Sequence, residues 1–99
     1  MILEIKMETT FRRNKDVIFR ESGDEVFIVV PSSGMGMKEE ALFTLTGTAR
    51  AIWQLLDGNT SVQQIIRSIV HDYDVSENVA RQDVTEFLEE LAVSGMLVS

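Results

Sequence analysis

The stretch that decides the fold is LTGTARAIWQLLDGNTSVQQIIRSIV, residues 45–70. In its first half, apolar side chains recur at the i, i+3, i+4 and i+7 spacing of one helix face. They are Ala49, Ile52, Trp53 and Leu56. Thr46 suits the N-cap position of this helix, and Asp57-Gly58 ends it.

Two more helices are predicted by the same reasoning. Thr60 and Gln63 have the spacing of a capping box, which predicts the start of a second helix. Ser76 followed by Glu77 predicts the start of a third. The apolar stripe of the second helix is Val62, Ile65, Ile66, Ile69 and Val70. The stripe of the third is Ala80, Val84, Phe87, Leu88 and Leu91.

The end of the third helix is also marked in the sequence. Gly95 suits the position just after the helix, where a left-handed residue is needed, and Met96 can then pack back on Leu91. Residues 96–98 are expected to form a short extended tail.

Upstream of the helices the pattern favours strands. Residues 17–20 and 25–30 are β-branched and aromatic, and the turn cluster 22–24 separates them, so they predict a hairpin. Both faces of 25–30 are apolar, which places that strand at the centre of a sheet. After Pro31 and a loop over 32–40, residues 41–45 predict a third strand, while 1–15 are expected to be an irregular lead-in.

The expected fold class is therefore α+β, in the order β-β-β-α-α-α. This is a winged helix-turn-helix-like arrangement, with a three-stranded antiparallel sheet followed by a three-helix bundle. A chain of 99 residues forms one domain, here 1–99. The longest apolar run, 26–30, is too short to cross a membrane, and the absence of cysteine fits the reducing cytoplasm, where we expect the protein.

Charge disfavours a nucleic-acid partner. The net charge is −7, and the third predicted helix carries Arg81 against five acids over residues 77–94. A duplex-binding protein needs lysine and arginine to neutralise phosphates, so a winged-helix DNA-binding regulator remains only as an alternative interpretation.

The residues that catalysis would need do not converge. His71 is the only histidine, cysteine is absent, and the serines lie at predicted caps and loops. We therefore expect no enzyme activity, no catalytic residue, no metal site and no cofactor.

The most informative feature is the third strand, which is an edge in a three-stranded meander. Edges are normally protected by charge, proline or a bulge, and this strand has none of these. Such an edge is either covered by the protein itself or used for strand addition by a peptide. The candidate peptide contacts on the strand are Ala41, Leu42, Phe43, Thr44 and Leu45.

The third helix supplies further candidate contacts beside its core stripe. They are Val79, Gln82, Asp83 and Glu86. Val79 can equally be a peripheral core residue, and an open edge can equally pair with its own copy in a homodimerisation domain.

Four segments together resemble the PqqD-like family. They are residues 45–58 and 60–66, the triplet Tyr73-Asp74-Val75, and residues 83–91 with 95–97. The resemblance implies a peptide chaperone or recognition element that binds the leader of a ribosomally made precursor peptide. It also implies that the leader adds beside the third strand, packs against the third helix and is presented to a modifying enzyme, often a radical SAM protein. The methionine-rich loop 32–40 departs from members that act in pyrroloquinoline quinone synthesis, so the pathway stays open.

Overall fold

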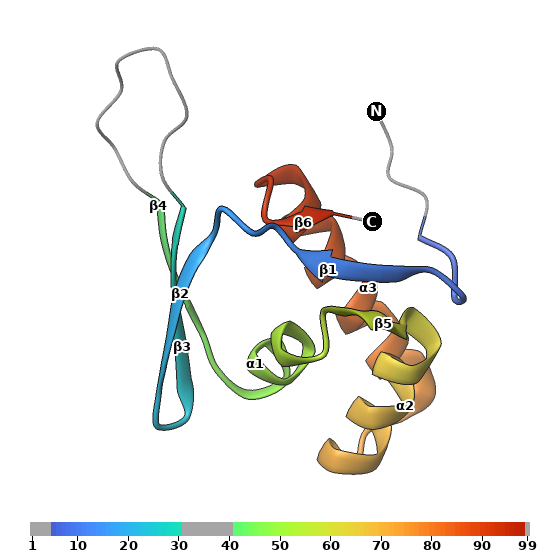
Figure 1. Cartoon of the computed structure of the whole chain (residues 1–99). Coiled ribbons are helices and arrows are strands. Elements are labelled where there is room, and N and C mark those ends of the chain that lie inside the picture. The colour runs from blue at the N-terminus through green and yellow to red at the C-terminus, as the bar shows by residue number, and fades with distance from the viewer. Residues whose placement is uncertain (1–4, 31–40, 99) are drawn as a thin grey trace.

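The computed structural model describes residues 5–30 and 41–98 (Figure 1). The strands are β1 (Thr10–Arg13), β2 (Ile18–Ser22), β3 (Glu25–Val30), β4 (Ala41–Leu45), β5 (Asp57–Ser61) and β6 (Leu97–Val98). The helices are α1 (Gly47–Gln54), α2 (Val62–Tyr73) and α3 (Glu77–Val93). The predicted α+β class, with an antiparallel wing preceding three helices, is confirmed.

The wing is the antiparallel sheet β2-β3-β4, with β3 in the centre as predicted. A two-residue turn joins β2 to β3, and Gly23 occupies its first central position with φ +59°. That conformation is typical of a type II′ turn, whose twist matches the flanking strands. The fully buried Val26 and Ile28 of β3 face the helices. The wing therefore has one inner face on the core, and its two edge strands are β2 and β4.

A second sheet, β5-β1-β6, corrects the expectation that residues 1–15 are irregular. Strand β1 pairs antiparallel with both β5 and β6, and Phe11 lies in the core with 4% of its surface exposed. The preceding segment is tied down as well, because the N–H groups of Val62 and Gln63 donate to the carbonyls of Thr9 and Met7, both at 2.9 Å. These partners are distant in sequence, which is why local patterning does not reveal the strand.

Helix α2 begins one residue later than predicted. The capping box is formed by Ser61 and Gln64: the Ser61 hydroxyl accepts from the Gln64 N–H, and the Gln64 side chain accepts from the Ser61 N–H. Thr60 does not cap the helix, because the Gln63 N–H that such a cap would accept donates to the Met7 carbonyl at 2.9 Å, while the Thr60 hydroxyl donates to Asp57 at 3.2 Å. Thr60-Gln63 and Ser61-Gln64 have the same spacing, so the sequence pattern alone does not distinguish the two possible capping boxes.

The predicted stop of α3 is confirmed. Gly95 has φ +76°, its N–H donates to Ala92 at 3.1 Å, and the Met96 N–H donates to Leu91 at 2.9 Å. These are the two bonds of a Schellman motif. Met96 and Leu91 are both buried, so the turn directs the chain back across the core into β6.

The Asp57 carboxylate is expected to make a small, pH-dependent contribution to the stability of the fold. Hydrogen bonds from the Asn59 N–H, and then from Thr60, hold the pKa of Asp57 below its ordinary value of 3.8. A depressed folded-state pKa stabilises the fold above the unfolded value, and that stability is lost as the pH falls through the folded value. We therefore expect Asp57→Asn to lower Tm at pH 7, with a difference that shrinks below pH ~4.

Thermal melts from pH 2.5 to 7 test this, with Asp83→Asn on the exposed face of α3 as the control. If the Tm of Asp57→Asn stays below that of the wild type by the same amount down to the lowest pH, the carboxylate charge does not have the assigned role.

Candidate functional site

The outer edge of β4 presents unpaired backbone groups. The pairing of Ser22 with Glu25 across the turn is the hydrogen-bonded kind, and pairing kinds alternate along an unbroken antiparallel ladder. Carried across β3, this alternation directs the N–H and C=O groups of Phe43 toward Ile28. Those of Leu42 and Thr44 therefore point away from the sheet. Among the described residues no strand pairs with that edge.

A groove runs between β4 and the C-terminal half of α3. One part, of about 310 Å³, has an apolar floor from β4, α1, α3 and the turn into β6. It is lined by Phe43, Thr44, Leu45, Ala49, Phe87, Glu90, Leu91, Ser94 and Met96. A second part, of about 550 Å³, is more open and is lined by Phe43, Glu86, Glu89, Glu90, Val93 and Ser94. Because the two share Phe43, Glu90 and Ser94, we treat them as one feature, the β4–α3 groove.

The open edge and the groove are adjacent because both belong to β4. Side chains alternate along a strand, so the side chains of Phe43 and Leu45 face the groove, while that of Thr44 is directed to the other face of the wing and Thr44 borders the groove at the strand backbone. An extended segment added to the edge would bond to Leu42 and Thr44 through its main chain. Every second side chain of that segment would then point into the groove.

The structure brings together only some of the predicted contacts. Phe43, Thr44, Leu45 and Glu86 line the groove. Ala41 and Leu42 belong to β4, and their side chains lie outside the described part of the structure. Val79, Gln82 and Asp83 are exposed and do not line it.

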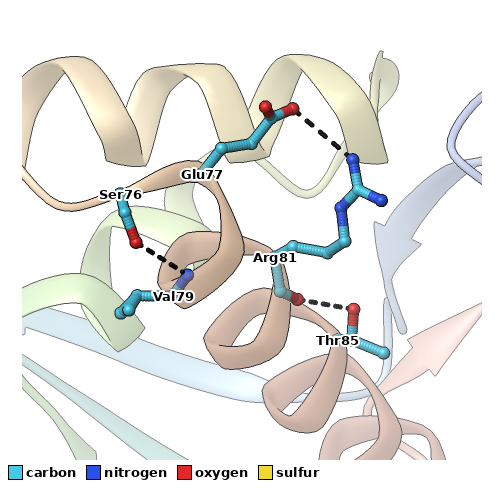
Figure 2. A network of polar contacts seen from close by, with 5 residues as sticks. All are labelled: Ser76, Glu77, Val79, Arg81 and Thr85. Carbon is cyan, nitrogen blue, oxygen red and sulfur yellow. Dashed lines mark hydrogen bonds and ion pairs between the residues drawn. The ribbon is translucent and has the colours of Figure 1, made fainter.

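Figure 2 shows the polar contacts made by residues in the N-terminal half of α3. The Val79 N–H donates to the Ser76 cap at 3.2 Å, and Arg81 pairs with Glu77 at 3.4 Å. The Thr85 hydroxyl donates to the Arg81 carbonyl at 2.6 Å. These are contacts within the helix, and none of them reaches β4.

Position along the helix axis explains which residues were missed. Val79, Asp83 and Glu86 share a helix face with Glu90 and Val93, so the predicted face includes the groove side. However, the 17 residues of α3 span about 26 Å, whereas the five residues of β4 span about 17 Å. Only the second half of the helix lies beside the strand, and one sequence does not reveal that offset.

No group of three His, Asp or Glu side chains among residues 5–30 and 41–98 is placed to hold a metal ion. His71 lies on α2 with 88% of its side chain exposed and makes a polar contact with Asp72 at 3.0 Å. Within the described ranges, no helix is long and apolar enough to cross a membrane.

Comparison with known proteins identifies a solved structure with a similar fold. None of the curated proteins matches the chain. Among solved structures, it is similar to one described as TbiB1 in complex with the TbiA(beta) leader peptide. The TM-score is 0.71 at 23% identity, and the match covers 87% of this chain and 93% of that chain. At this identity the likeness concerns the fold.

The family model for coenzyme PQQ synthesis protein D matches residues 25–97, from β3 through the first residue of β6. That range includes β4, all three helices and every residue that lines the β4–α3 groove. It confirms the resemblance seen in the sequence, and the chain belongs to the PqqD family.

Proposed function

We propose that this protein is a non-catalytic recognition element that binds the leader segment of a ribosomally made precursor peptide. The leader adds as a strand to the outer edge of β4, its side chains enter the β4–α3 groove, and the complex presents the precursor to a modifying enzyme in the cytoplasm. The observation that carries the proposal is the juxtaposition of an unguarded strand edge with an apolar groove. Main-chain bonds then supply affinity, and the groove supplies selectivity.

Membership of the PqqD family supports this function, as does the likeness to a structure whose partner is a leader peptide. The proposed enzyme is of the radical SAM type, which is what the family resemblance implies. The DNA-binding alternative is disfavoured because α3 carries Arg81 against five acids, and Arg81 is already paired with Glu77.

Fluorescence anisotropy tests the proposal. Labelled synthetic peptides covering the short reading frames encoded beside this gene are titrated with the protein, and a scrambled version of each is the control. We expect one peptide to bind with a Kd of about 1 μM or tighter, and its scrambled form to bind far more weakly. If no peptide binds and sedimentation shows a concentration-dependent dimer, the edge pairs with a second copy and the proposed function is wrong.

A further inference from the structure

Resting on the proposed function, we infer that the leader bound in the β4–α3 groove carries a lysine or arginine two residues from its apolar anchor. Glu86, Glu89 and Glu90 recognise that cation. The site itself is defined by the strand edge and the groove floor, and the three carboxylates decide which extended peptides it accepts.

The groove combines an apolar floor with an acidic wall. Phe43, Phe87 and Leu91 contribute the floor, and on the open side the three glutamates and Val93 contribute the wall. All three glutamates are exposed, and 89% of the surface of Val93 is exposed. An occupant must therefore match apolar surface and negative charge within one short segment.

These carboxylates have no cationic partner in the described part of the chain. The ion pairs found there are Arg81 with Glu77 and the contact of His71 with Asp72. Glu86 accepts a hydrogen bond from the neutral Gln82 side chain at 3.2 Å. Arg81, the only cation on α3, is engaged one turn toward the N-terminus, away from the groove.

Their placement is unfavourable for the helix by itself. Glu89 and Glu90 lie near the C-terminus of α3, where the helix dipole favours cations, and the last turn contains no basic residue. Glu86 and Glu90 are four residues apart, a spacing at which like charges repel. The sequence thus departs from helix preferences at the turns that border the groove, as expected where function outweighs local stability.

A cation on the ligand would relieve each of these unfavourable terms. In an extended peptide, residues i and i+2 point to the same side and lie about 7 Å apart. A leader whose apolar residue contacts Phe43 and Phe87 therefore places its next groove-facing side chain toward the acidic wall. The expected ligand is an extended peptide with Lys or Arg two positions from an aromatic or aliphatic residue.

Selection from a displayed library of random 12-residue peptides tests this. The targets are the wild-type protein, the isosteric variant Glu86→Gln/Glu89→Gln/Glu90→Gln, and Thr44→Pro, which blocks the strand edge. We expect wild-type binders to be enriched in the apolar–x–basic pattern. Binders of the triple variant should keep the apolar preference and lose the basic one.

Two further measurements use one selected peptide. Its Kd should rise about 10-fold for the triple variant, and raising the salt concentration should weaken wild-type binding but not the residual binding of the variant. The free triple variant should melt a few degrees higher than the wild type, because the repulsion and the dipole conflict are removed. A gain in Tm together with a loss of affinity is a combination that simple misfolding cannot produce.

Wild-type binders without a basic bias, or a bias that persists in the triple variant, overturn the inference and leave the proposed function standing. If the wild type enriches no peptide over Thr44→Pro, strand addition itself is wrong, and the inference falls with it.

Discussion

Replacing Thr44 with proline is expected to raise the Kd for a leader peptide about 100-fold while leaving the protein folded. The N–H of Thr44 points away from β3, so a proline there removes no bond of the wing, and edge positions of this kind tolerate proline. For an added strand, however, the change deletes one main-chain donor and places a ring where the peptide must approach. Two lost or strained hydrogen bonds account for a change of this size.

The matched control is Thr44→Val, which keeps the N–H and alters only the exposed side chain. Anisotropy titration should show near wild-type affinity for Thr44→Val, and far-UV circular dichroism should show wild-type spectra for both variants. If folded Thr44→Pro binds as tightly as the wild type, the peptide does not add to this edge.

The second large effect concerns stability. Trp53→Ala is expected to cost about 3–5 kcal/mol, a large part of the 5–15 kcal/mol of a typical domain. Trp53 is fully buried, and its ring meets that of Phe19 edge-to-face with centroids 5.5 Å apart. The Arg13 guanidinium lies 5.7 Å from the Trp53 ring and donates to its carbonyl at 2.7 Å. One side chain thus joins α1, the wing and the end of β1.

Urea unfolding followed by circular dichroism measures this cost, with Trp53→Phe as the graded control. Phenylalanine keeps most of the ring contacts and removes the indole Nε1–H, which is buried without a hydrogen-bond partner among the described residues. We expect a loss of only about 1–2 kcal/mol for it. Equal unfolding midpoints for Trp53→Ala and the wild type would contradict the central position given to this residue.

The helices could be predicted because their signals are local. Caps, apolar stripes and the glycine stop all lie within a few residues of one another. Two boundaries differ from the prediction: α1 ends at Gln54, before Asp57-Gly58, and α2 begins one residue later. Strand β1 could not be predicted in this way. Its partners lie in β5 and β6, more than 40 residues downstream, and two of its four residues are arginines. Tertiary pairing alone makes that segment a strand.

The candidate site also has one part that local sequence signals predict and one part that depends on tertiary packing. The open edge of β4 could be predicted, because the order of the strands and the lack of charge and proline in residues 41–45 can both be read from the sequence. The helix contribution could not, because it depends on which part of α3 lies beside β4, and that tertiary relation has no local signal in the sequence. Phe87, Glu89, Glu90 and Val93 were accordingly absent from the predicted contacts. The run of acids after Asp83 was the available signal, and it reads equally well as a solvated helix face.

The measurement that tests strand addition most directly is a ¹⁵N–¹H titration of the labelled protein with the leader peptide that binds most tightly. If the leader adds beside β4, the largest shifts fall on the amides of residues 42–46 and 86–94, and the Thr44 amide becomes protected from solvent exchange. Shifts confined to other surfaces, such as the cavity between α2 and α3 lined by Ile66, Val70 and Glu77, would show that the peptide binds elsewhere.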